Sequence, residues 1–239
     1  MNERPFSAHA AQLPLALRFP PDQRFDTFVA APGGAIAQLR ALAQGQSVAG
    51  GLYIAGAAAT GKSHLLLAAC ADADAAGRRV AYLPLAAAVG RVRDALDAVE
   101  HADLIALDGL DAVVGDRENE VALFDAHNRA RDAGRSVLYA ARATPGDLDP
   151  MLPDLRSRLS QCARIVLEPL DDDGRAEVLR LRAQRRGLQF DEAAIDWLLK
   201  RVGRDLVSLT ALLDRLDRES LAAQRRLTVP FLRQVLEPC

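Results

Sequence analysis

Short runs of apolar residues recur between residues 51 and 167, and longer amphipathic segments separate them. The runs that predict strands cover residues 51–55, 79–84, 104–108, 136–140 and 164–167. The run that ends at Asp108 is apolar along its length, which is typical of a central strand covered on both faces. Strands that alternate with helices predict a parallel sheet with crossover connections. We therefore expect an α/β domain in which two layers of helices enclose a parallel sheet.

After residue 168, the apolar residues occur at helical spacing, and no further strand is predicted. Three aspartates, 171–173, predict the start of a first helix. A second helix is expected from an N-terminal cap at Asp191, a third from leucines spaced between 206 and 216, and a short last one from a cap at Thr228. These segments predict a small, all-helical lid.

The chain is expected to have three parts. Pro14, Pro20 and Pro21 prevent regular structure near the N-terminus. The expected parts are an N-terminal arm at residues 1–24, the α/β domain at 25–167 and the helical lid at 168–239.

Composition excludes several classes of protein. A net charge of −2 and a pI near 6.1 argue against a general nucleic-acid binder. The three cysteines are far apart and fit a reducing cytosol without a cysteine metal site. No apolar run is long enough to cross a bilayer. We expect a cytoplasmic protein that does not bind membranes.

Residues Gly56 to Ser63 carry the spacing G-x-x-x-x-G-K-[ST] between a predicted strand and a predicted helix. The glycines let backbone N–H groups approach phosphate oxygens, and the start of the helix directs its positive end at them. Lys62 would reach the β- and γ-phosphates, and the Ser63 hydroxyl would bind Mg²⁺. The alternative is a turn rich in Gly and Ala. The motif predicts ATP or ADP together with Mg²⁺.

Acidic residues follow the strand that ends at Asp108. An aspartate at such a strand end holds the Mg²⁺ shell in phosphate-loop proteins, and a turn residue is the alternative here. Gly109 occupies the place where many hydrolysing relatives have a second acid. Asp111 is the nearest other acid. It is either a displaced substitute for that acid or a surface turn residue, so whether the chain itself turns over ATP stays open.

By these motifs the chain resembles AAA+ ATPases of the DnaA family, closest to the Hda group of DnaA regulatory inactivators. The resemblance covers nearly the whole chain. The matching segments are Arg24–Val29, Ser63–Cys70, Leu152–Leu159, Asp214–Arg218 and Ala223–Phe231. The residues that the motif and the resemblance assign to the nucleotide are Phe25, Phe28, Gly56, Ala59, Thr60, Gly61, Lys62, Ser63 and His64.

The resemblance also implies an arginine finger in the segment Leu152–Leu159. Arg158 is the residue that matches it, and its guanidinium would neutralise charge on a phosphoryl group in a neighbouring subunit. A surface or ion-paired arginine is the alternative. Arg156 is a weaker candidate for the same interface.

The chain departs from the family pattern in the lid. Val207 occupies the position of an arginine that senses the γ-phosphate, and Arg204 lies one helical turn earlier. Arg142 and Thr144 follow the fourth strand, but neither is a secure match to the family's other sensor. The sequence ends at Cys239, soon after the lid, so we do not expect the DNA-binding domain of an initiator.

Residues Gln12 to Leu17 resemble the short peptide by which replication factors bind the DNA polymerase sliding clamp. The residues expected to contact the clamp are Gln12, Leu13, Leu15 and Leu17. An extended segment would place the two later leucines against an apolar groove, and the glutamine would supply hydrogen bonds at one end. A tail packed on its own domain is the alternative.

The resemblance implies a negative regulator of replication initiation. It would dock on the β sliding clamp, hold ADP or ATP, and promote hydrolysis of DnaA-bound ATP, with DNA contact at most indirect through the clamp. Association with the nucleoid would follow from the clamp, and a homo-oligomer stays open. The alternatives are a stand-alone ATPase such as a helicase loader, and a scaffold with a structural nucleotide. The lid arginines expected on a solvated or partner-facing surface are Arg180, Arg182, Arg185 and Arg186.

Overall fold

The computed structural model describes residues 19–20, 22–46, 51–201, 206–223 and 226–236. The expected clamp peptide at 12–17, Arg204 and the side chain of Val207 lie outside the described residues.

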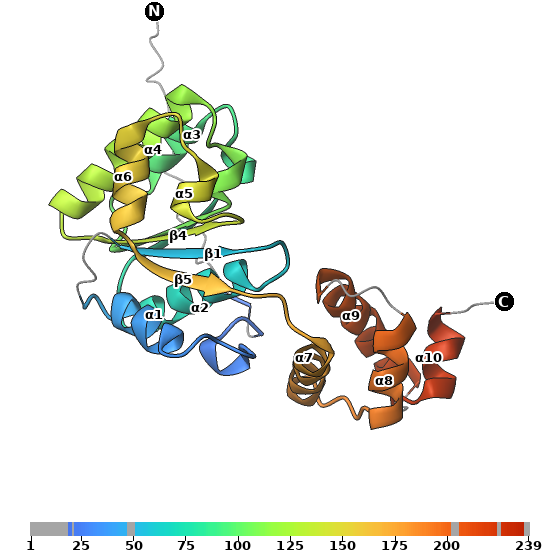
Figure 1. Cartoon of the computed structure of the whole chain (residues 1–239). Coiled ribbons are helices and arrows are strands. Elements are labelled where there is room, and N and C mark those ends of the chain that lie inside the picture. Colours follow the sequence, from blue (N-terminus) through green and yellow to red (C-terminus); the bar gives the residue numbers. More distant parts are fainter. Residues whose placement is uncertain (1–18, 21, 47–50, 202–205, 224–225, 237–239) are drawn as a thin grey trace, which may run out of the picture.

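A five-stranded sheet forms the middle layer of the first domain (Figure 1). The strands are β1 (Leu52–Gly56), β2 (Val80–Pro84), β3 (Leu104–Asp108), β4 (Ser136–Ala141) and β5 (Ala163–Leu167). They lie in the order β2-β3-β4-β1-β5, and every pairing is parallel. Because β4 separates β3 from β1, the loops that follow β1 and β3 leave the same carboxyl edge of the sheet on either side of β4.

Helices cover both faces of this sheet (Figure 1). One face carries α1 (Ala35–Ala43) and α2 (Lys62–Ala75), and the other carries α3 (Val92–Ala98), α4 (Arg117–Asp132), α5 (Pro145–Leu148) and α6 (Pro153–Gln161). Along β1, Leu52 and Ile54 belong to the core shared with α1 and α2, whereas Tyr53 and Ala55 belong to the core on the other face. The central strands β1, β3 and β4 are almost entirely apolar because each supplies residues to both cores. The expected α/β fold is confirmed.

Short 3₁₀ helices in the described connections are η1 (Phe25–Thr27), η2 (Leu85–Ala88) and η3 (Leu110–Ala112). Phe19 precedes η1, within the segment expected to be an arm. Its side chain is only 9% exposed and packs in the core beside α1 and α2. Helix α4 begins at Arg117, where the Asp116 carboxylate caps its start by accepting from the Asn119 N–H at 2.9 Å.

The lid consists of α7 (Asp172–Arg185), α8 (Glu192–Arg201), α9 (Leu206–Ala223) and α10 (Val229–Leu236). Asp171 caps α7 by accepting from the Gly174 N–H at 2.8 Å. These helices bury a separate apolar cluster that includes Leu198, Leu209, Leu216 and Phe231. The lid follows the carboxyl end of β5 (Figure 1), which places it beside the loop edge of the sheet.

Among the described helices, none is both long and hydrophobic enough to pass through a bilayer.

Candidate functional site

The loop between β1 and α2 is shaped by its two glycines. Gly61 has φ +94°, in the left-handed region, and a Cβ there would lie 2.6 Å from the Phe28 ring. A Cβ on Gly56 would lie 2.7 Å from both the Leu167 carbonyl oxygen and the Thr60 hydroxyl. Neither position therefore accepts a side chain without rearrangement. The loop turns tightly and starts α2 at Lys62.

Side chains from α2, β3 and β2 meet at the carboxyl edge of the sheet. The Lys62 ammonium donates to the carbonyl oxygens of Gly56 and Ala57, both at 2.7 Å. The Ser63 hydroxyl donates to Asp108 Oδ2 at 2.5 Å. Burial lowers the pKa of Lys62, and the nearby carboxylates of Asp111 and Asp108 oppose that shift. The predicted phosphate and Mg²⁺ residues thus lie together.

A tyrosine that the sequence did not single out also reaches this cluster. The Tyr82 hydroxyl, from β2, donates to Asp108 Oδ2 at 2.7 Å. Burial, followed by the hydrogen bond to Asp108, raises the pKa of Tyr82. The Asp108 carboxylate is therefore held from two sides, by Ser63 and by Tyr82.

Asp111 has a structural partner. It lies in η3, and both of its carboxylate oxygens accept from the backbone N–H of Arg142 at 2.9 Å. This contact ties the loop after β3 to the end of β4. Thr144, also after β4, donates to Asp147 at 2.5 Å. Asp111 is thus bound to the backbone, while its charge still acts on Lys62.

A cavity of about 370 Å³ lies between this loop, the segment after Pro20, and the lid. The sequence-assigned residues that line it are Phe28, Ala59, Thr60, Gly61, Lys62, Ser63 and His64. The lining residues that were not assigned are Gln23, Thr27, Val29, Leu170, Val178 and Arg182. Phe25 is buried in the core beside α1 instead. The unassigned residues are ordinary apolar and polar positions in sequence, so no motif could have marked them.

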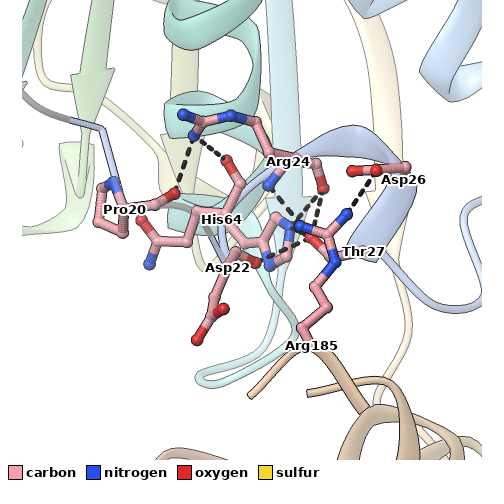
Figure 2. Close-up of polar contacts among 8 residues, drawn as sticks. Pro20, Asp22, Arg24, Asp26, Thr27, His64 and Arg185 are labelled. Atoms are coloured by element: carbon pink, nitrogen blue, oxygen red, sulfur yellow. Dashed lines mark hydrogen bonds and ion pairs between the residues drawn. The ribbon is translucent and has the colours of Figure 1, made fainter. Parts of the chain in front are cut away.

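Figure 2 shows how His64, at the start of α2, binds the segment before the sheet. Its Nε2 lies 2.8 Å from the Arg24 carbonyl oxygen and 3.3 Å from the Thr27 hydroxyl. The Phe28 ring meets the imidazole edge-on, with the ring centroids 5.3 Å apart. Burial lowers the pKa of His64. His64 therefore fixes this segment against the phosphate loop.

The lid reaches the same segment through two ion pairs. Arg185 binds Asp26 at 2.5 Å (Figure 2), and Arg186 binds Asp22 at 2.8 Å. The expectation that the basic residues of α7 form a solvated or partner-facing surface is wrong for Arg186, whose side chain is 19% exposed, and for Arg182, which lines the cavity. Arg185 is exposed as expected, although it pairs within the chain. Arginines can cross between domains in this way because their long side chains bind carboxylates through a fixed, forked group.

Arg158 lies away from this cavity, on α6. Leu155 and Leu159 of the same helix are fully buried and hold it against the sheet domain. Within the part of the chain that the structure describes, the half-buried Arg158 guanidinium makes no hydrogen bond or ion pair. Arg156, by contrast, binds Asp149 at 3.0 Å and the Gly146 carbonyl oxygen at 3.4 Å.

The charge of Arg158 affects the pKa of a buried histidine, His127. His127 is 3% exposed, and its Nδ1 lies 2.8 Å from the Tyr139 hydroxyl. Burial, followed by the charge of Arg158, lowers the pKa of His127 to about 4. Helix α6 packs against α4, and the Arg158 charge therefore acts on this buried imidazole.

The residues of the cavity fit a nucleotide with Mg²⁺. Its volume is in the range of small-molecule sites, and Thr60 and Gly61 of the phosphate loop line it. Gln23 Oε1 is buried and has no hydrogen-bond partner among the described residues, so it offers an acceptor to a base amino group. One carboxylate and one hydroxyl suit Mg²⁺, which keeps several waters and binds phosphate oxygens.

Comparison with known proteins adds a family match for the lid. Residues 172–236 match the model described as Hda, lid domain. Domain III of the replication initiation protein DnaA from Thermotoga maritima is 20% identical, with a TM-score of 0.76 over 92% of this chain and 97% of that one.

Two further structures share the fold. AMPPCP-bound DnaA from Aquifex aeolicus is 22% identical, with a TM-score of 0.65 over 87% of this chain and 69% of that one. The RuvB Holliday junction branch migration motor of Thermotoga maritima is 17% identical, with a TM-score of 0.64 over 90% and 71%. At these identities the likeness concerns the fold. The chain therefore shares with these proteins an α/β domain followed by a helical lid, and residues 172–236 of that lid match the Hda lid model.

Proposed function

We propose that this chain is a nucleotide-holding negative regulator of DNA replication initiation, which supplies Arg158 to ATP bound by a DnaA-type partner. The observation that carries the proposal is the difference in hydrogen bonding between the nucleotide site and Arg158. Lys62, Ser63 and Asp108 of the chain's own nucleotide site have partners within the chain. The Arg158 guanidinium, in contrast, makes no hydrogen bond among the described residues. An arginine with unused donors suits an anion from another molecule.

In its own site, the chain would hold ADP or ATP. Lys62 and the loop N–H groups would bind the phosphates, and Ser63 and Asp108 would bind Mg²⁺, which neutralises phosphate charge. Phe28 and His64 would position the nucleotide beside the lid. Gly109 stands where a water-polarising acid is expected, and Asp111 is bound to the Arg142 backbone. The site therefore favours holding a nucleotide over rapid turnover.

In the partner's site, Arg158 would stabilise charge as the γ-phosphoryl group is transferred to water. A guanidinium supplied in trans contributes about 10³-fold or more to the rate in known cases. Docking on the sliding clamp through residues 12–17 belongs to the same proposal, because it would raise the local concentration of the chain near its partner.

The test measures ATP hydrolysis by ATP-bound DnaA with clamp loaded on DNA, with and without this chain. We expect clamp-dependent stimulation by the parent protein, only a small residual stimulation by Arg158→Ala, and nearly full stimulation by the matched control Arg156→Ala. Stimulation by Arg158→Ala equal to that of the parent would remove the finger assignment. Replacing Gln12, Leu15 and Leu17 with alanine should abolish the dependence on the clamp.

The same assay separates the alternatives. A helicase loader or other stand-alone ATPase would hydrolyse ATP rapidly without DnaA or clamp. A scaffold with a structural nucleotide would bind it tightly and leave the nucleotide on DnaA unchanged. Either outcome would contradict the proposal.

A further inference from the structure

We infer that Glu120 is a positioning residue for Arg158; this inference rests on the proposed function. Glu120 lies in the first turn of α4 and is 0% exposed. Its Oε1 accepts from the N–H groups of Gly115 at 2.8 Å and Met151 at 3.1 Å, and its Oε2 accepts from Leu152 at 2.7 Å. Burying a carboxylate is costly unless it is fully hydrogen-bonded, and here three backbone donors surround it.

Two of those donors stand directly before the helix that carries Arg158. Leu152 is the N-cap of α6, and Met151 precedes it. Pro153 is the first residue of α6 and has no N–H. The Glu120 carboxylate therefore holds the last two N–H groups before the helix, and so fixes the point at which α6 begins.

The other contacts of α6 do not fix it in the same way. Leu155 and Leu159 bury its apolar face, but apolar contacts are non-directional, and the helix has only nine residues. The ion pair from Arg156 to Asp149 is exposed, with side chains 49% and 77% accessible, and exposed pairs contribute little. The buried, directional hydrogen bonds of Glu120 are what restrain sliding and rotation of α6.

The same carboxylate also holds the loop that follows η3. Gly115 lies between η3, which contains Asp111, and the start of α4. Glu120 thus joins the loop after β3 to the start of α6. A guanidinium that must enter another protein's site needs such support, because a shift of about 1 Å in a catalytic group can cost about 10²-fold in rate.

The test uses Glu120→Gln in the full-length chain, with DnaA-bound ATP and loaded clamp. The amide keeps the shape of the side chain but turns an NH₂ group toward a backbone donor. We expect the maximal stimulated rate to fall about tenfold, while the chain concentration at half-maximal stimulation and the affinity for ADP stay within about twofold, because neither binding surface changes. Glu118→Gln, in the same helical turn but exposed, is the control and should match the parent.

A double substitution tests whether Glu120 acts through Arg158. In an Arg158→Ala background, Glu120→Gln should cause no further loss of stimulation, since the group it positions is gone. A further loss as large as in the parent background would overturn the inference. So would parental stimulation by Glu120→Gln, and in that case loss by Arg158→Ala would still uphold the proposed function. Full stimulation by Arg158→Ala would instead refute the proposed function itself.

A second variant addresses folding. Glu120→Asp keeps the charge but shortens the reach by one methylene, so it should also lower the maximal rate without changing the far-ultraviolet circular dichroism spectrum. If neither variant folds or binds ADP, Glu120 supports the domain as a whole, and the inference is wrong.

Discussion

The phosphate loop and helix α6 present their charged groups in opposite ways. At the phosphate loop, the Lys62 ammonium binds two carbonyl oxygens, and the Ser63 hydroxyl binds Asp108, which also accepts from Tyr82. On α6, the Arg158 guanidinium binds no acceptor in the described part of the chain, although its helix is firmly packed. One region satisfies its polar groups internally, and the other leaves five donors for a ligand from outside.

This difference distinguishes a site that retains a nucleotide from a side chain that binds a phosphate of another molecule. Groups held by internal hydrogen bonds keep one orientation, as a site that retains a nucleotide requires. A guanidinium with free donors on a fixed helix gains most when a phosphate from another molecule reaches it. The contrast predicts that substitutions in one region leave the property of the other region intact.

The largest expected effect is on nucleotide affinity. Lys62→Ala should weaken ADP binding about 10²-fold, or about 3 kcal/mol, because charge-assisted hydrogen bonds to the phosphates are lost. Isothermal titration calorimetry measures this directly. Lys200→Ala, which removes the other lysine of the sequence from an exposed lid position, should bind as the parent does. ADP affinity unchanged in Lys62→Ala would place the nucleotide elsewhere.

A smaller effect is expected on stability in acid. Because burial holds the pKa of His127 at about 4, the unfolded chain binds a proton near pH 6.5 that the folded chain does not. The free energy of unfolding therefore rises with pH across this window, and falls by about 2 kcal/mol as the pH drops from about 6.5 to about 5.

Urea unfolding at these two pH values measures that loss. His127→Gln should reduce the pH dependence, whereas His101→Gln should preserve it, because the His101 side chain is 77% exposed. An equal pH dependence in parent and His127→Gln would show that other groups cause the acid lability.

The smallest expected effect concerns α6 and the neighbouring helix α4. Arg158→Gln should raise the pKa of His127, since the arginine charge is the second cause of its depression, by less than about 1.4 kcal/mol in free energy. An NMR titration of the imidazole measures this change. Arg156→Gln should leave the titration where it is in the parent. A His127 pKa unchanged in Arg158→Gln would mean that the guanidinium points away from α4.

Much of the fold follows from local pattern. The central strands are almost entirely apolar because each faces two cores, and the helix predicted after the Gly56–Ser63 loop begins within two residues of the observed start of α2. The lid helices follow from leucines at helical spacing and from caps such as Asp171. These signals depend on residues close together in sequence, which is why they can be read there.

The parts that sequence did not predict depend on distant pairing. Glu120 stands in a polar helical start, and nothing local indicates that a carboxylate there is fully buried. Gln23 and Arg182 are far apart in the sequence, but both line the same cavity. The arginines of α7 looked like a solvated surface because their partners precede the sheet. Such contacts depend on tertiary packing, which produces no repeating pattern in the sequence.

The lid ion pairs have a consequence for the order of folding. Arg185 and Asp26 are 159 residues apart, and Arg186 and Asp22 are 164 apart, with the whole sheet domain between them. Contacts of such sequence separation form late, because the intervening chain must first become compact. During synthesis the aspartates emerge long before the arginines. The lid wall of the cavity, which includes Arg182, therefore closes only after the sheet has been made, so a nascent chain completes its nucleotide site as one of its last folding steps.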